Sequence, residues 1–225
     1  MSFAKGKFEA ELNDIEKLLR NIDFFEERNF YPSNDFDPSV YRKKNYLENW
    51  KSLISDNIYS FMLTDNSILN FKLDIDNRKI SYTYYECPFK SLSYKEYLID
   101  NDIDFEEDSK IFIDYYEVYL HQCEQKENPL MIRYDYDENS YFEGVHPASH
   151  LHVGHKNQVR LGLNKILTPK SFTSIILRQN YPAYWKTLII SKNTWREAFL
   201  KEKSALLDIS SSHWKKLDKS EFHLN

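Results

Sequence analysis

The spacing of apolar residues changes along the chain, and each spacing predicts a different secondary structure. Near the N-terminus apolar side chains recur every three or four positions, at Phe8, Leu12, Ile15, Leu19 and Ile22. This period matches one face of an α-helix, which we expect over about residues 5–27. Residues 29–38 hold two prolines among Ser, Asn and Asp, so they predict a loop. A short helix is expected after it, over about residues 39–56.

The middle of the chain has the pattern of an antiparallel β-sheet. Runs rich in aromatic and β-branched residues are separated by turn-forming Asp and Asn, at 59–63, 68–75 and 79–87. In the second run Phe71, Leu73 and Ile75 alternate with polar residues, which predicts that one face of the sheet is buried. Runs of the same character predict further strands over 130–136, 141–145, 150–153 and 158–163.

Helices are expected between and after these strands, over about 91–100, 106–125 and most of the last third. Thr168-Pro169 predicts an N-cap followed by proline in the first turn, and Thr194 with Glu197 has the spacing of a capping box. Further helices are expected to begin at Pro182 and Ser212. No Gly/Ser linker divides the chain, so we expect a single α+β domain over residues 1–225. It would contain an antiparallel sheet of five to seven strands, helices packed on one face, and a helical C-terminal third.

Composition excludes several classes of protein. The chain has 225 residues, enough for a sizeable core, and its 17 Tyr and 15 Phe argue against disorder. No apolar run approaches the roughly 18 residues of a membrane span, and no secretory signal is visible, so we expect a cytoplasmic protein without membrane contact. Cys87 and Cys123 make neither a disulfide framework nor a zinc motif. Four scattered glycines exclude the two glycine-rich phosphate-binding motifs.

The charge is distributed unevenly along the chain. Residues 1–144 contain 17 Lys/Arg and 30 Asp/Glu, whereas residues 145–225 contain 13 and 5, together with six of the seven histidines. A basic, His-rich part predicts a polyanionic ligand such as RNA, and the acidic part allows a protein partner. Two alternatives stay open: the two parts attract each other, or the basic residues form a solvated helix surface.

The densest group of chemically active side chains is a histidine cluster. Four histidines fall within ten residues, at His146, His150, His152 and His155. On a strand His150 and His152 would point to the same face, with Cα atoms about 7 Å apart, while Leu151 and Val153 would face the core. Beyond the turn at Gly154, either Lys156 or Arg160 could reach the same pocket.

Three interpretations of this cluster are open. As a general acid and base, His150 and His152 would cleave a phosphodiester while Arg160 stabilises the phosphorane charge, and RNA would supply its own 2′-OH nucleophile. As metal ligands, the pair would suit zinc or manganese. The third metal ligand would then come from His146, His155, Asp135 or Glu143. As structural residues, the histidines would be hydrogen-bonded within the fold.

The same segment resembles an uncharacterised bacterial family of unknown function. The similarity is carried by Ser149-His150-Leu151-His152-Val153-Gly154, Arg160, Thr168-Pro169-x-x-Phe172 and Ile175-Ile176-Leu177-Arg178-x-Asn180-Tyr181-Pro182-x-x-Trp185. It covers about residues 130–190. The resemblance implies site roles for His150, His152 and Arg160, and packing roles for Phe172, Tyr181 and Trp185. His146 and His155 have no place in the family pattern. Membership of this family implies no established activity. Proteins of this type occur among toxin and anti-phage accessory genes, from which we expect a nuclease or a toxin.

These features together predict an intracellular nuclease, directed at RNA, of a toxin or anti-phage defence module. The expected catalytic residues are His150, His152 and Arg160. The expected substrate-binding residues are Lys156, His155 and Arg178. The reaction would use either no cofactor or a divalent metal held by His150, His152 and His146. One alternative is a non-catalytic subunit that binds nucleic acid or a protein partner, and another is a metal-dependent phosphohydrolase.

Overall fold

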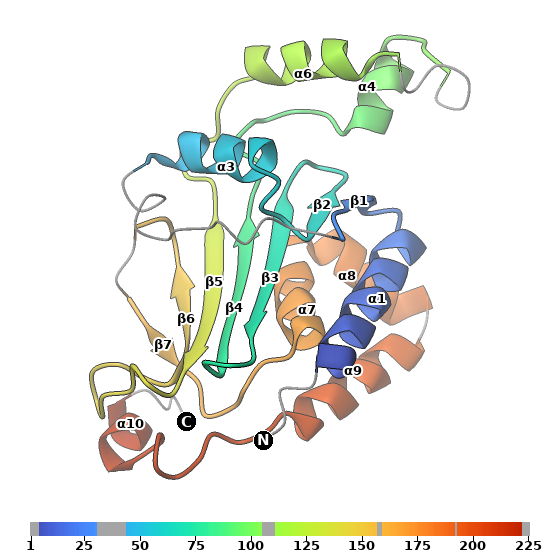
Figure 1. Cartoon of the computed structure of the whole chain (residues 1–225). Helices are drawn as coiled ribbons and strands as arrows, with labels where there is room; N and C mark the ends of the chain where they lie inside the picture. The colour runs from blue at the N-terminus through green and yellow to red at the C-terminus, as the bar shows by residue number, and fades with distance from the viewer. Residues whose placement is uncertain (1–4, 31–43, 105–110, 157–158, 192, 222–225) are drawn as a thin grey trace. The chain divides into compact units, whose positions relative to one another are not determined.

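The computed structural model describes residues 5–30, 44–104, 111–156, 159–191 and 193–221 (Figure 1). Parts of the predicted loop over 29–38, the predicted helices over 39–56 and 106–125, and the predicted strand over 158–163 lie outside these residues. The fold is α+β, with a seven-stranded antiparallel sheet and several helices. This fold class and the number of strands confirm the prediction from the sequence.

The strands of the sheet are neighbours in the order in which they occur along the chain. They are β1 (Phe25–Arg28), β2 (Phe61–Leu63), β3 (Ile68–Asp74), β4 (Lys79–Tyr85), β5 (Met131–Asp137), β6 (Ser149–Val153) and β7 (Leu161–Gly162). The order needs no crossover connection, which agrees with the alternating turn signals in the sequence. The expected hairpin after the histidine pair is present, because β6 and β7 pair antiparallel with His150 opposite Gly162.

The helices lie before, between and after the strands, and the C-terminal part of the chain is helical as predicted. They are α1 (Lys5–Asn21), α3 (Tyr46–Ser55), α4 (Tyr94–Asp100), α6 (Ile113–Gln122), α7 (Pro169–Asn180), α8 (Pro182–Ser191), α9 (Asn193–Ala205) and α10 (Lys216–Glu221). Thr168 caps α7 as expected, with Pro169 in the first turn. Within the described ranges, no helix combines the length and apolar character needed to cross a membrane.

Contacts divide the chain into two compact units. Unit 1 consists of Met1–Ile22, Asn70–Tyr84 and Met131–Asn225, and unit 2 consists of Asp23–Leu69 and Tyr85–Leu130. Unit 1 therefore holds α1, most of β3 and of β4, β5 to β7, and α7 to α10. Unit 2 holds β1, β2, α3, α4 and α6. The expectation of one domain over residues 1–225 stays a prediction.

In unit 1, one face of the sheet is aromatic and is covered by α1 and α7. The ring of Tyr82 on β4 contacts Phe71 of β3, Tyr134 of β5, Phe172 of α7 and Phe8 of α1. α1 also packs directly against α7. Aromatic side chains bury large areas, so this cluster contributes much of the packing energy of unit 1. It confirms that helices pack on one face here.

The opposite face of the same strands is polar, because side chains alternate along each strand. Lys79 forms an ion pair with Asp137 at 2.9 Å, and Ser81 donates a hydrogen bond to Asp135 at 2.9 Å. These contacts show that odd-numbered residues of β4 and β5 share one face. The candidate site lies on this polar face.

Three local predictions were wrong. The first helix ends at Asn21 and not near residue 27, because Asp23 adopts a positive φ of 51° and the chain continues as β1. Residues 141–145 form a turn closed by an isolated bridge between Phe142 and His146, and not a strand. α10 begins at Lys216, after the expected start at Ser212, whereas α9 begins at Asn193 and the capping role predicted for Thr194 lies outside the described side chains.

Candidate metal centre

The register between β5 and β6 brings the histidine pair to two residues of the preceding strand. Asp135 lies opposite His150, and Arg133 lies opposite His152. Directly opposite residues of an antiparallel pair project from the same face of the sheet. The strand therefore places His150 and His152 on one face, as predicted, together with Asp135.

The three side chains converge on a common point. His150 Nε2 lies 3.1 Å from His152 Nε2, and Asp135 Oδ2 lies 3.9 Å and 3.6 Å from these two nitrogens. A point equidistant from the three atoms is about 2.1 Å from each, which is the distance at which zinc binds histidine nitrogen and carboxylate oxygen. Asp135, His150 and His152 therefore form a group that could hold a metal ion, and these three residues are called the metal group.

The orientation of the His150 ring suits metal binding. Its Nδ1 lies 2.8 Å from the carbonyl oxygen of Pro147. A carbonyl only accepts, so Nδ1 carries the proton and Nε2 presents its lone pair to the group. Histidine ligands of metals commonly donate their second ring nitrogen in this way, which fixes the ring and its tautomer.

The His152 ring distinguishes a metal-bound arrangement from a metal-free one. Without a metal, His152 Nε2 must donate to His150 Nε2, and the buried Nδ1 of His152 then has no hydrogen-bond partner in the described part of the chain. With a metal, both Nε2 lone pairs point to the ion and Nδ1 becomes a donor. The backbone carbonyl of Val159 could then accept the hydrogen bond from Nδ1. Hydrogen bonding to this backbone acts to raise the pKa of His152.

The surroundings of both rings favour their neutral form. Burial lowers the pKa of His150 to about 4, although the charge of Asp135 opposes the shift. Burial also lowers the pKa of His152, and the positive charges of Arg133 and Arg160 lower it further. A neutral imidazole is a metal ligand and a base, whereas a general acid must carry a proton.

Asp135 is held by two residues that the sequence analysis did not include in the site. Ser81 donates to its Oδ1 at 2.9 Å, and Arg133 Nε donates to its Oδ2 at 2.7 Å. Such outer contacts orient the ligands of a metal. Arg133 could have been found from the sequence, because it stands two positions before Asp135 on the same strand and therefore shares its face. Ser81 is distant in sequence and gives no such signal.

Of the other predicted site residues, some lie near the metal group and some do not. His146 and Arg160 lie near it. The His146 ring meets the His150 ring edge-on, with centroids 5.0 Å apart, but it is not part of the three-residue group. The charge of Arg160 lowers the pKa values of His146 and His152, after burial as the larger cause, which places Arg160 beside the site.

The remaining candidates are not brought to the metal group. Glu143 accepts a hydrogen bond from the backbone of Leu217 at 3.3 Å, so it holds α10 instead. His155 and Lys156 lie in the turn after β6 and do not belong to the three-residue group. Arg178 is exposed in the last turn of α7, the helix that covers the opposite, aromatic face of the sheet.

The expected burial along β6 is reversed. The histidines are 2% and 5% exposed, whereas Val153 is 36% exposed and Leu151 is only partly buried. Loops adjoin both rings, because Pro147 accepts a hydrogen bond from His150 and the backbone of Val159 acts on the pKa of His152, while the helices pack over the opposite face of the sheet. Polar side chains are tolerated inside a protein when such partners are present.

The residues assigned to packing by the resemblance do pack. Phe172 is fully buried against Phe71 and Tyr82. The hydroxyl groups of Tyr181 and Tyr84 lie 2.7 Å apart and form a hydrogen bond. Trp185 meets Phe199 edge-on, with ring centroids 5.3 Å apart.

Comparisons with known proteins place the chain in a family without describing its activity. No curated protein and no solved structure matches it. A family model described as an uncharacterized conserved protein, DUF2290, matches residues 21–225 and so includes the whole metal group. The chain belongs to the DUF2290 family.

Proposed function

We propose that the chain is a metal-dependent phosphodiesterase that hydrolyses nucleic acid. Asp135, His150 and His152 would hold a divalent ion. The observation that carries this proposal is the convergence of two neutral imidazole nitrogens and one carboxylate oxygen at ligand spacing, on a face supported by Ser81 and Arg133.

The charge around the group favours an anionic substrate. Asp135 supplies one negative charge, while Arg133 contacts it at 2.7 Å and Arg160 acts on the neighbouring histidines. The positive charges of Arg133 and Arg160 already equal or exceed the single negative charge of Asp135. A bound divalent ion would add two more positive charges. A phosphodiester neutralises such a site, whereas an uncharged substrate does not.

The reaction is the hydrolysis of one phosphorus–oxygen bond. Water adds to phosphorus, the bond to the leaving alcohol breaks, and the proton of the water ends on that alcohol oxygen. A divalent ion held by these residues would lower the pKa of a bound water molecule and would stabilise negative charge on the phosphoryl oxygens. The chain's own contribution is to fix the ligands through Pro147, Ser81 and Arg133, and to offer Arg160 to the phosphate charge.

A metal-free acid–base reaction is less well supported by the same geometry. It would require one of the two rings to be protonated before the reaction, and burial lowers the pKa values of both. RNA as the substrate, and a place in a toxin or anti-phage module, stay predictions from the sequence.

The test combines metal analysis with a cleavage assay. We would measure metal content after dialysis against zinc or manganese, and cleavage of labelled RNA and single-stranded DNA with and without EDTA. The variants are Asp135→Asn and His152→Ala, with His213→Ala as a matched control that removes a histidine outside the group. We expect one bound ion in the wild type and control, loss of binding in both variants, and cleavage that EDTA stops and added metal restores.

Stability measurements keep the outcome clear if a variant folds poorly. A ligand that binds only the folded state raises the melting temperature, so EDTA should lower the melting temperature of the wild type but not of His152→Ala. Cleavage that survives EDTA but not His152→Ala would overturn the role of the metal. Metal binding without cleavage of either nucleic acid would overturn the hydrolase and favour a binding subunit.

A further inference from the structure

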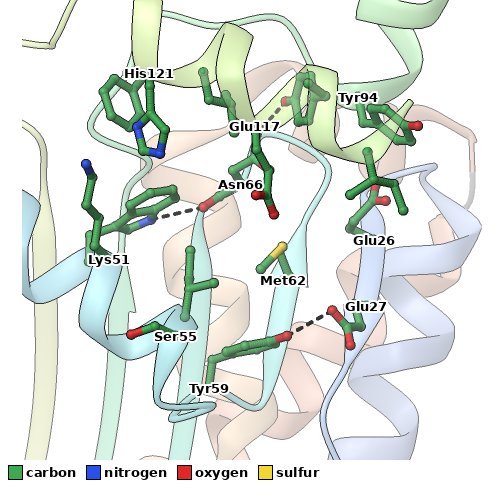
Figure 2. Close-up of a pocket in the computed structure, with 16 residues that line it drawn as sticks. Glu26, Glu27, Lys51, Ser55, Tyr59, Met62, Asn66, Tyr94, Glu117 and His121 are labelled. Carbon is green, nitrogen blue, oxygen red and sulfur yellow. Dashed lines mark hydrogen bonds between the residues drawn. The ribbon is translucent and has the colours of Figure 1, made fainter. Parts of the chain in front are cut away.

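Unit 2 contains a cavity that plays no part in the metal group. Its volume is about 710 Å³, and residues from β1, α3, β2, α4 and α6 line it (Figure 2). Every lining residue belongs to unit 2, whereas Asp135, His150 and His152 belong to unit 1. Cavities of this size are typical of small-molecule sites.

One wall of the cavity is aromatic and is held in place by hydrogen bonds. The Trp50 ring meets Phe89 edge-on with centroids 5.8 Å apart, and Phe89 meets His121 in the same way at 6.0 Å. Trp50 Nε1 donates to the carbonyl oxygen of Asn66 at 3.1 Å, and the side-chain amide of Asn66 donates to Tyr116 at 2.6 Å. The wall is therefore preorganised, with aromatic faces and edges available to a ligand.

The opposite side of the cavity carries carboxylates. Glu26 and Glu27 come from β1 and lie on the far side of the picture from Lys51, whereas Glu117 comes from α6 and lies near Asn66 (Figure 2). Tyr59 donates a hydrogen bond to Glu27 at 2.8 Å. In the part of the chain that the structure describes, none of the three carboxylates forms an ion pair.

A β-bulge puts two neighbouring glutamates into the same space. Phe25 pairs with Leu63 and Glu27 pairs with Met62, so Glu26 is an extra residue in β1. In a regular strand consecutive side chains point to opposite faces, but across this bulge both glutamates line the cavity together with Met62. Bulges often re-aim side chains at binding sites.

This arrangement carries an electrostatic cost that a cation would remove. Both glutamates are exposed to solvent, which screens their repulsion, but the surrounding protein, and then the charge of Glu27, still raise the pKa of Glu26. Two carboxylates side by side disfavour each other's ionised form. A positively charged group between them restores the ionised form of both and gains charge-assisted hydrogen bonds.

We propose that this cavity binds a small organic cation, with its ammonium or guanidinium group between Glu26 and Glu27 and its carbon skeleton against the aromatic wall that contains Trp50. The aromatic wall and apolar side chains such as Met62 and Leu120 can cover the carbon skeleton. The lining holds three carboxylates against the single ammonium group of Lys51, so its net negative charge disfavours an anionic ligand. The site is independent of the metal group, so either proposal can fail without the other.

The test is a calorimetric titration of the full chain with matched ligands. The probes are agmatine and phenethylammonium, with phenethyl alcohol as the uncharged counterpart and phenylpropionate as the anionic one. We expect both cations to bind and the other two not to bind. Glu26→Gln and Glu27→Gln should each weaken binding about tenfold, because each removes a charged hydrogen bond. Glu127→Gln, a matched change outside the cavity lining, should leave binding unchanged.

The folding of the variants gives a second readout. Glu26→Gln removes a repulsive contact between like charges, so the melting temperature should stay the same or rise. A loss of binding in this variant would then not result from unfolding. Equal binding of phenethyl alcohol, equal effects of Glu26→Gln and Glu127→Gln, or no binding of either cation would overturn the proposal. Binding of a short lysine peptide without binding of the free amines would also overturn it and point to a protein partner.

Discussion

One buried carboxylate holds the C-terminal helix α10 to the loop that carries His146. Asp218 is 0% exposed and accepts three hydrogen bonds, from Tyr141 Oη at 2.6 Å, Gly144 N at 3.0 Å and Lys215 N at 2.8 Å. Glu143 ties the same loop to α10 through the backbone of Leu217. These contacts explain why Glu143, an acidic candidate from the sequence, serves the fold and not the metal group.

We predict that Asp218→Asn lowers the free energy of unfolding at pH 7 by roughly 2 to 4 kcal/mol, because one amide group cannot accept all three bonds and the charge is lost. Burial acts to raise the pKa of Asp218, but the bonds from Tyr141, Gly144 and Lys215 outweigh it and lower the pKa. Stability from this carboxylate is therefore present above its ordinary pKa and is lost as the pH falls through the lowered value.

Urea denaturation at several pH values tests this prediction. The difference between wild type and Asp218→Asn should be largest near pH 7 and should shrink in acid, below the ordinary pKa of an aspartate. Asp208→Asn is the control, since the Asp208 side chain is 73% exposed in its pair with Lys165 and should matter little. A difference that stays constant down to strong acid would contradict a role for the charge.

At the scale of elements, β5, β6 and the start of α7 are joined by one chain of hydrogen bonds. The backbone N–H of Leu167 donates to the Tyr134 hydroxyl at 3.0 Å, which lies 3.0 Å from the Ser149 hydroxyl, which donates to the carbonyl of Lys165 at 2.7 Å. Because Ser149 donates onward, Tyr134 must donate to Ser149 and accept from Leu167. Tyr134 is 0% exposed, so water cannot replace its hydrogen-bond partners, and the polar groups of this chain of bonds satisfy one another.

We predict that Tyr134→Phe lowers the free energy of unfolding by about 1 to 3 kcal/mol, because it leaves the buried N–H of Leu167 without an acceptor. The ring remains, so packing against Tyr82 is retained and metal content should not change. Tyr115→Phe is the control, because Tyr115 is 63% exposed. Thermal and urea unfolding measure the effect, and a Tyr134→Phe variant as stable as Tyr115→Phe would show that the chain of bonds contributes nothing.

Periodicity predicted most elements, but it could not predict how they meet. The alternating pattern located β3, β4, β5 and β6 to within about two residues. It also placed His150 and His152 on one face. The partner Asp135 was one of four alternatives, because the choice depends on the β5–β6 register, which the local sequence does not fix.

The failures have local physical causes. Apolar residues continue past α1 at Ile22 and Phe24, so the helical pattern hides the positive φ of Asp23 and the short strand β1. The bulge at Glu26 breaks the alternation that would reveal a strand of only four residues. The cavity was therefore not predictable from the sequence, because its walls come from elements far apart in the chain.

At the scale of the whole molecule, charge differs between the two units as well as along the sequence. Unit 1 contains 21 Lys/Arg and 15 Asp/Glu, whereas unit 2 contains 9 and 20. The basic balance belongs to the unit with the metal group, and the acidic balance belongs to the unit with the proposed cation site. Each balance matches the charge of the ligand proposed for that unit, which favours a polyanion on one and a cation on the other.

If nucleic acid binds at the metal group, its affinity must fall with salt, because binding releases counterions from the phosphates. For single strands the slope of log K against log salt is about −0.7 for each phosphate neutralised. We predict that Arg160→Met makes this slope shallower by about that amount, while Arg178→Met leaves it unchanged, since Arg178 lies on the helix that covers the opposite face. Fluorescence anisotropy of labelled RNA, with EDTA to prevent cleavage, measures both slopes. A change with Arg178→Met alone would move the RNA to the α7 side and separate nucleic-acid binding from the metal group.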